Sequence, residues 1–258
     1  MIVDRWDIAG LRDIIAQASA GSGCPDSIHD KIAYVLKTQE YAAQIAAHPL
    51  FVLAYSASED LTILEGVRLV NIFLQIVFGV QDIPCGNMVE FGSYKGGGAV
   101  FMAILCRELY PDAYVVALDT FSGMPGTDPK QDYHKAGDFA DSDLQKLQQR
   151  ITDLNLQNLH VGEGLFHETF PKFFNGSTDK IALAHIDCDI YDSVYTACEL
   201  AYPHMVEGGL YIFDDALYPT CIGAQRAVEE YMIIAKNLRS IALHPVSTFK
   251  HSNLRSAE

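Results

Sequence analysis

The stretch VEFGSYKGGGAVFMAIL, residues 89–105, joins a short apolar run, a glycine-rich turn and a longer apolar segment. A second apolar run, AYVVALD, follows at residues 113–119. A strand, a helix and another strand in this order are typical of two parallel strands joined by a crossover helix. The stretch therefore predicts an α/β protein and places its first strand, its first crossover helix and its second strand.

The same alternation continues toward the C-terminus. Runs that are apolar almost throughout, such as IALAHI at residues 181–186, indicate strands that are buried on both faces. We therefore expect a mostly parallel sheet with helices on both faces. The further predicted elements are helices at 142–154, 193–205 and 221–237 and strands at 158–164, 181–187, 208–215 and 241–249.

The first part of the chain, residues 1–82, reads as a helical N-terminal extension ahead of a domain at 83–258. Helical spacing runs through residues 30–49. It is predicted to end at Pro49, because proline breaks a helix. A second helical pattern covers residues 56–78, and Ser58 is placed to cap its start. We therefore expect helices, and no strands, before the first strand of the sheet.

Composition excludes several classes of protein. The chain has 258 residues and 49% hydrophobic content, enough for one sizeable core. Because 18 Lys and Arg stand against 33 Asp and Glu, the net charge is −15, and no nucleic-acid or membrane partner is expected. Neither a signal peptide nor a membrane span is predicted, and the six cysteines include no CxxC pair. We expect a cytoplasmic protein with reduced cysteines.

The glycine-rich turn after the first predicted strand is suited to a ligand. Gly92 permits a sharp turn, and the three glycines at 96–98 open the next helix without side chains over its N–H groups. The pattern is neither GxGxxG nor GxxxxGK[ST], so the dinucleotide and P-loop fingerprints are absent. Asp119 ends the second predicted strand, where a carboxylate can accept the hydroxyls of a ribose or, alternatively, cap a turn.

Acidic residues end two of the later predicted strands. Asp187 and Asp189 follow IALAHI, and Asp214 and Asp215 follow LYIF. The carboxyl ends of parallel strands meet at one edge, where open α/β sheets bind their ligands. Neighbouring carboxylates repel one another unless a cation lies among them, and an all-oxygen ligand set favours Mg²⁺ over zinc. These residues predict a divalent-metal site, and the alternative is that they cap turns and pair with basic residues.

Glu90 places a carboxylate inside a predicted buried strand. Such a group requires a cationic or hydrogen-bonding partner. The sulfonium or ammonium group of a ligand would serve, and so would a basic side chain such as Arg68.

Residues 121–141 are rich in Gly, Pro and Asp and show no helical or strand pattern. Structureless segments of this length are uncommon inside compact domains unless they serve a function. We therefore expect a lid over the binding site.

Four segments, in this order, resemble the macrocin O-methyltransferase family. They are VEFGSYKGGG (89–98), ALDTFSGMPGT (117–127), HIDCDIYDS (185–193) and GGLYIFDD (208–215). The resemblance implies the Rossmann-like sheet of class I methyltransferases, S-adenosylmethionine as the cofactor, and Mg²⁺ or another hard divalent cation. It also implies a homo-oligomer, and metal ligands at Asp187, Asp214 and Asp215.

The resemblance further implies where the cofactor lies. Its methionine part is expected at the glycine-rich turn, its ribose at Asp119, and its adenine near the turn at 162–164. The implied cofactor residues are Glu90, Phe91, Gly92, Ser93, Gly96, Asp119, Thr120, Phe121, Gly162, Glu163 and Asp187. The chain departs from the family pattern at Cys188, where the family has glycine, and at His185, which stands for the family's basic residue.

The resemblance implies an O-methyltransferase that acts on a sugar hydroxyl in a natural product or a nucleotide-linked glycoside. Metal coordination lowers the pKa of a hydroxyl, and a nearby carboxylate can take its proton. Asp187 is the favoured base and Asp189 is the alternative. His134 and His185 are weaker candidates. The competing functions are a catechol-like phenolic O-methyltransferase and a cofactor-binding module without catalysis.

Overall fold

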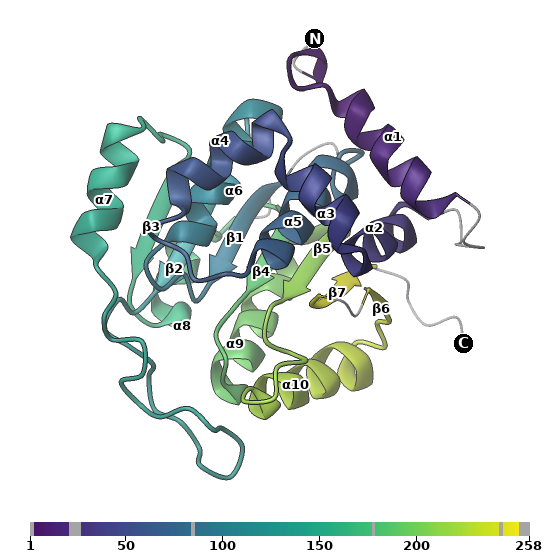
Figure 1. Ribbon diagram of the computed structural model, residues 1–258. Coiled ribbons are helices and arrows are strands. Elements are labelled where there is room, and N and C mark those ends of the chain that lie inside the picture. Colours follow the sequence, from purple (N-terminus) through teal and green to yellow (C-terminus); the bar gives the residue numbers. More distant parts are fainter. Residues whose placement is uncertain (1–2, 21–26, 84–85, 177–178, 243–244, 253–258) are drawn as a thin grey trace.

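The computed structural model describes residues 3–20, 27–83, 86–176, 179–242 and 245–252 (Figure 1). Their centre is a seven-stranded sheet in the order β3-β2-β1-β4-β5-β7-β6. The first five strands in this order pair in parallel, and β7 is antiparallel to both of its neighbours. The strands are β1 (Asn87–Phe91), β2 (Val115–Asp119), β3 (Leu159–Glu163), β4 (Ile181–Ile186), β5 (Met205–Phe213), β6 (Ser240–Ala242) and β7 (Ser247–Lys250).

Helices cover both faces of this sheet, as its apolar strands require. In Figure 1, α4, α5 and α6 lie over one face, whereas α9 and α10 lie on the other. The helices are α1 (Ile8–Ser19), α2 (Ile28–Lys37), α3 (Gln39–Ala46), α4 (Pro49–Ser58), α5 (Gly66–Leu74), α6 (Gly97–Leu109), α7 (Leu144–Asp153), α8 (Phe166–Thr169), α9 (Tyr191–Ala201) and α10 (Ile222–Val228). Two of them continue as π-helices, α5 through Gln75–Gly79 and α10 through Glu229–Ala235.

Alternation along the strands decides which side chains face which helices. Met88 and Leu183 belong to the core on the side of α1–α6, and Val89 and Ala184 belong to the core on the side of α9 and α10. By the same alternation Glu90 lies on the side of α6, two residues along from Met88. The predicted fold, a mostly parallel sheet with helices on both faces and a helical N-terminal part, is thus confirmed.

The helix boundaries before β1 differ from the prediction. The pattern at 30–49 divides at Thr38, and Pro49 begins α4 instead of ending a helix, because the first helical position needs no N–H donor. Ser58 lies at the end of α4, where its hydroxyl donates to the carbonyl of Ala54 at 3.0 Å. The predicted single helix over 56–78 is therefore wrong: residues 59–65 form a loop, and α5 begins at Gly66.

The C-terminal prediction also needs correction. One closing strand at 241–249 was expected, and the structure has two short antiparallel strands, β6 and β7, in its place. Among the described residues, Cys106, Cys188, Cys198 and Cys221 are buried and form no disulfide, whereas residues 24 and 85 lie outside the described ranges. Within those ranges, no helix is both long and apolar enough to cross a membrane.

Candidate functional site

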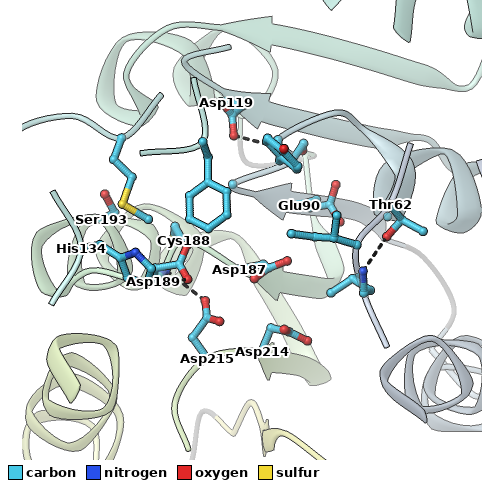
Figure 2. A pocket seen from close by; sticks show the side chains of 18 of the residues that line it. Thr62, Glu90, Asp119, His134, Asp187, Cys188, Asp189, Ser193, Asp214 and Asp215 are labelled. Atoms are coloured by element: carbon cyan, nitrogen blue, oxygen red, sulfur yellow. Dashed lines mark hydrogen bonds and ion pairs between the residues drawn. The ribbon is translucent and has the colours of Figure 1, made fainter. Parts of the chain in front are cut away.

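A cavity of about 290 Å³ opens beyond the carboxyl ends of β1, β2, β4 and β5. Its floor is formed by the glycine-rich turn and the strand ends, and its walls by residues 61–65 and the segment between β2 and α7. Figure 2 shows acidic side chains along its length, from Asp119 at one end, past Glu90 and Asp187, to Asp214 and Asp215. This is the edge at which the rule for open α/β sheets places a ligand.

Two glycines after β1 lie in close contact with other residues of the site, Gly92 with the backbone of Asp187 and Gly98 with the side chain of Glu90. Gly92 has φ +85°, and a Cβ there would lie 1.9 Å from the carbonyl oxygen of Asp187. A Cβ on Gly98 would lie 2.1 Å from Oε1 of Glu90. At position 92 only glycine fits, because φ is positive and the close atom belongs to the backbone, whereas a Cβ at position 98 would displace the end of the Glu90 side chain.

Asp119, the last residue of β2, is tied to this turn. Its carboxylate accepts the backbone N–H of Tyr94 at 2.8 Å and that of Phe121 at 2.7 Å. Burial raises the pKa of Asp119, although the two N–H donors act in the opposite direction. A carboxylate fixed in this way at the wall of the cavity can accept hydroxyl groups of a ligand.

Three carboxylates meet at the ends of β4 and β5. Oxygen atoms of Asp187, Asp214 and Asp215 all lie within 4.8 Å of one another. Sheet-like backbone bonds hold them in place, because the N–H of Asp187 donates to Phe91 at 2.9 Å and that of Asp214 donates to Ile186 at 3.0 Å. Burial and the neighbouring acids raise the pKa of Asp187 well above its usual range and that of Asp215 to about 6.

This triad fits a hard divalent cation. Three carboxylate oxygens form a ligand set that suits Mg²⁺ and leaves further coordination positions free. Oδ1 of Asp214 is buried and has no hydrogen-bond partner, and a buried unpaired carboxylate oxygen is costly without a cation. Burial and the neighbouring acids raise the pKa values of Asp187 and Asp215, and a bound cation would act against both effects.

Arg68 of α5 is the arginine next to the triad. Its guanidinium contacts Oδ2 of Asp214 and lies over the ring of Tyr218, 4.8 Å from the ring centroid. The alternative that basic residues pair with the strand-end acids therefore holds for Asp214. The suggested pair of Glu90 with Arg68 does not form.

Glu90 instead faces His185 on the adjacent strand. Oε1 of Glu90 lies 3.0 Å from Nδ1 of His185, and Nε2 of His185 lies 3.7 Å from Oδ1 of Asp214. Burial alone would lower the pKa of His185, but the carboxylates of Asp214 and Glu90 raise it to about 9. The imidazole thus stands between the turn after β1 and the acidic triad.

Asp189 lies beside the triad and carries its own contacts. Its backbone has φ +58°, in the left-handed region, and its N–H donates to Oδ2 of Asp215 at 3.0 Å. Its carboxylate accepts the Cys221 thiol at 3.4 Å and lies 3.7 Å from Nε2 of His134. Burial and the charge of Asp215 raise the pKa of Asp189 to about 8. A carboxylate in this condition can take up a proton near neutral pH.

A comparison with protein families matches residues 65–247 to the family described as macrocin-O-methyltransferase (TylF). The matched residues contain every strand from β1 to β6 and every side chain of the acidic triad. This match extends over well more than half of the chain. The chain belongs to the macrocin O-methyltransferase family.

Curated relatives agree with the family. The chain is 28% identical to a demethyldecarbamoylnovobiocin O-methyltransferase of Streptomyces niveus, over 58% of this chain and 59% of the relative. It is also 28% identical to 8-demethyl-8-(2,3-dimethoxy-alpha-L-rhamnosyl)-tetracenomycin-C 4'-O-methyltransferase of Streptomyces olivaceus, over 64% of each chain. The match to a mycinamicin III 3''-O-methyltransferase of Micromonospora griseorubida is 27%, over 64% of this chain and 67% of that one. The chain thus spans about 59% and 64% of the first two of these relatives.

Solved structures show the same fold. The O-methyltransferase NovP superposes with a TM-score of 0.62 at 23% identity, over 87% of this chain and 98% of that one. A calicheamicin methyltransferase superposes with a TM-score of 0.58 at 21% identity, over 78% of this chain and 93% of that one. A methyltransferase of Podospora anserina, solved with SAH bound, superposes with a TM-score of 0.54 at 10% identity, over 83% of this chain and 94% of that one. These structures establish a class I methyltransferase fold for the chain.

The cofactor residues implied by the macrocin O-methyltransferase family divide into two groups. Six of them line the cavity: Glu90, Gly92, Ser93, Asp119, Thr120 and Asp187. The other five stand outside its lining: Phe91 stacks on Phe170, Gly96 caps α6 against Leu147, Phe121 packs at the edge of the core, and Gly162 and Glu163 end β3. The roles of both groups stay predictions.

Sequence reasoning missed the N-terminal contribution to this site. Residues 61–65 and Arg68 line the cavity together with Tyr218. The loop lies directly on the turn after β1, because a Cβ on Gly97 would come within 2.5 Å of Leu61 and Thr62. Sequence offers one signal, the triple glycine, which shows that something approaches the start of α6 closely. It does not say which segment does so.

Proposed function

We propose that this chain is an S-adenosylmethionine-dependent O-methyltransferase that methylates a sugar hydroxyl of a glycoside with the help of a divalent cation. The observation that carries the proposal is the convergence of two groups in one cavity. Asp187, Asp214 and Asp215 lie at one end, and the glycine-rich turn with Glu90 and Asp119 lies beside them. Membership of the macrocin O-methyltransferase family supports the reaction.

Glu90 and Asp119 are the residues that would hold the methyl donor. Oε2 of Glu90 is buried and has no hydrogen-bond partner, so it can accept a hydrogen bond from the ammonium of the donor. Asp119 is oriented by two backbone N–H groups at the far end of the turn, where it would accept the ribose hydroxyls. Fixing the donor at both ends aligns its methyl group for an in-line displacement, which is the main catalytic requirement of such a transfer.

The acidic triad would hold the cation, which when bound lowers the pKa of a coordinated hydroxyl. Asp189 is then the better placed proton acceptor, because Asp187 is engaged in the triad while the Asp189 side chain faces His134 and Cys221. Without a cation the pKa of Asp189 is raised to about 8, and a cation in the triad would lower it toward neutral pH, where the carboxylate can accept a proton. His134 and Cys221 keep the Asp189 carboxylate at the wall of the cavity.

The cavity favours a glycoside with an apolar aglycone over a nucleotide-linked sugar. Among the described lining residues, Arg68 alone carries a permanent positive charge, and it already contacts Asp214, so a diphosphate would meet repulsion. The rim is apolar, since Ile63 is 67% exposed and Tyr218 is 45% exposed. Seven carboxylates line the cavity: Glu65, Glu90, Asp119, Asp187, Asp189, Asp214 and Asp215.

The test is calorimetry with S-adenosylmethionine and Mg²⁺, followed by a methylation screen against aryl and macrolide glycosides. We expect cofactor binding that survives chelation by EDTA and turnover that does not. Asp187→Ala should abolish turnover while Asp192→Ala, an exposed carboxylate in the first turn of α9, should leave it unchanged. Turnover that persists with EDTA, or equal loss in both variants, would contradict the metal site.

Two further predictions accompany the proposal. We expect a homo-oligomer, which light scattering on the purified chain would detect. We also expect the chain to act in the cytoplasm, where its reduced cysteines would be stable. A monomer in solution would contradict the first prediction without affecting the chemistry.

A further inference from the structure

Glu90 and His185 occupy neighbouring positions on the two central strands. The register of β1 and β4 pairs Glu90 directly with His185, and both side chains are almost fully buried, at 2% and 0% exposure. The distance of 3.0 Å between Oε1 and Nδ1 is that of a hydrogen bond. The sheet itself therefore sets this contact, since both side chains project from the same level of adjacent strands.

The contact has a direction along the sheet. Strand alternation puts Asp214, two residues beyond Ile212 of β5, on the same face as His185. His185 thus has Glu90 on its Nδ1 side and Asp214 on its Nε2 side, 3.7 Å from Oδ1. Figure 2 shows Glu90 and Asp214 on opposite sides of this part of the cavity, with Asp187 between them. One imidazole separates two carboxylates that face different parts of the site.

The orientation of Glu90 depends on this neighbour. Oε1 of Glu90 fills the space above Gly98 and faces His185, which leaves Oε2 buried without a partner at the cavity. No described side chain other than His185 is hydrogen-bonded to Glu90. A buried carboxylate held by a single side-chain contact loses its fixed orientation when that contact is removed.

We propose that His185 is a positioning residue, which holds the Glu90 carboxylate toward the ammonium of the methyl donor and keeps it apart from the metal-binding Asp214. This inference rests on the proposed function, because it assumes that the cavity binds the methyl donor and that the triad binds a cation. It adds a residue that contacts neither of them and acts through Glu90. It also predicts that loss of the Glu90 contact weakens donor binding without weakening metal binding.

Two polar substitutions separate the two sides of the imidazole. The amide of His185→Asn takes roughly the place of Nδ1 and keeps a donor for Glu90, whereas that of His185→Gln takes roughly the place of Nε2 and faces Asp214. Calorimetry with S-adenosylhomocysteine measures the donor site without turnover. We expect His185→Gln to bind it about tenfold more weakly than the wild type, which is the effect of losing one hydrogen bond to a charged group, and His185→Asn to stay within about threefold.

The action through Glu90 is tested with a double-mutant cycle. Glu90→Gln alone should weaken S-adenosylhomocysteine binding, and adding His185→Gln should weaken it no further, because the two residues form one unit. Mn²⁺ binding, followed by electron paramagnetic resonance, should be unchanged or tighter in both His185 variants. His48→Gln is the matched control, because His48 is also buried but caps α4 away from the cavity.

The outcomes distinguish this inference from the proposed function. If the wild type fails to bind S-adenosylhomocysteine, the proposed function itself is wrong. If the wild type binds it and both His185 variants bind equally well, His185 has no positioning role. Weakened binding of both S-adenosylhomocysteine and Mn²⁺ in both variants, or strictly additive effects with Glu90→Gln, would show a merely structural role and overturn the inference.

Discussion

The guanidinium of Arg68 contacts the carboxylate of Asp214, although 146 residues separate the two in the chain. Arg68 comes from α5, in the helical part before the sheet, and Asp214 follows β5 at its carboxyl end. The N-terminal helices therefore supply the positive charge nearest to the acidic triad. Because the same guanidinium stacks on Tyr218, it is held at the edge of the cavity and competes with a cation for Asp214.

Replacing Arg68 by Gln should destabilise the metal-free protein and make it more dependent on a divalent cation. Removing one partner of a buried ion pair leaves the other uncompensated, at a cost of about 3 kcal/mol. Added Mg²⁺ should recover most of this loss, because it supplies the missing positive charge. Thermal unfolding in EDTA and in Mg²⁺ measures both effects. Arg239→Gln, at an exposed arginine, should change neither unfolding curve. If Mg²⁺ does not raise the melting temperature of Arg68→Gln, the triad is not a cation site.

The metal-free protein should lose stability as the pH rises from about 5 to about 9. Burial and the neighbouring acids raise the pKa of Asp215 to about 6, and burial and Asp215 raise that of Asp189 to about 8, against 3.8 ordinarily. The folded state therefore binds more protons than the unfolded state over this range, and the free energy of unfolding falls with rising pH. The raised pKa of His185, about 9, acts in the same direction, since its stabilisation is complete below 6.5 and is lost through pH 9.

Thermal melts in EDTA at a series of pH values measure this slope. Mg²⁺ should flatten it, because a bound cation favours the ionised carboxylates. Asp215→Asn should also flatten it in EDTA, since one of the titrating groups is then absent. A melting temperature that rises between pH 6 and pH 9 without metal would show that these carboxylates are not buried together as described.

The five parallel strands could be predicted because their apolar runs are short and are followed by Gly or Asp. The loop at residues 59–65 could not, because Leu61 and Leu64 continue the helical spacing of the residues after them. They form a loop because a tertiary contact overrides the spacing: Leu61 is buried against Gly97. A local hydrogen bond, from the N–H of Leu64 to the Thr62 hydroxyl at 3.1 Å, also favours a turn. Local spacing carries no information about such contacts.

The candidate site was also predicted only in part. The acidic residues at the ends of two predicted strands indicated the triad, because the carboxyl ends of parallel strands lie at one edge of the sheet. The partner of Glu90 could not be predicted. Glu90 contacts His185 because β1 lies beside β4 and the register of these strands pairs the two residues. Neither the order nor the register can be read from one sequence, so the basic partner of Glu90 was sought in Arg68.

Replacing Gly98 by Ala should weaken binding of the methyl donor. The added Cβ would stand 2.1 Å from Oε1 of Glu90, so the carboxylate must turn away from its contact with His185. Alanine otherwise favours a helix over glycine by about 1 kcal/mol, so the melting temperature should fall little or not at all. Calorimetry with S-adenosylhomocysteine should show a loss of about tenfold. Gly126→Ala, with no atom within 4 Å of its Cβ, is the matched control, and equal affinities in the two variants would contradict the role of the Glu90 orientation in donor binding.

Binding of the methyl donor should slow tryptic cleavage between β2 and α7. This segment has no helix or strand, and its exposed Lys130 and Lys135 are cleavage sites. It is attached to the turn after β1, since the Tyr94 hydroxyl donates to Asp141 at 2.6 Å and the backbone N–H of Tyr94 donates to Asp119. We therefore expect a ligand that orders this turn to order residues 121–141 as well, as closing segments do in other enzymes.

Mass spectrometry of the fragments locates the cuts, and their rates with and without S-adenosylhomocysteine measure the protection. Asp141→Asn should speed cleavage of the free protein, because it weakens the contacts of this segment with Tyr94 and Lys95. The same variant should keep most of its protection at saturating ligand, since the attachment of Asp132 to the backbone N–H of Tyr191, at 2.9 Å, remains. Cleavage at Lys130 and Lys135 that proceeds at one rate in every condition would mean that the segment does not respond to the site.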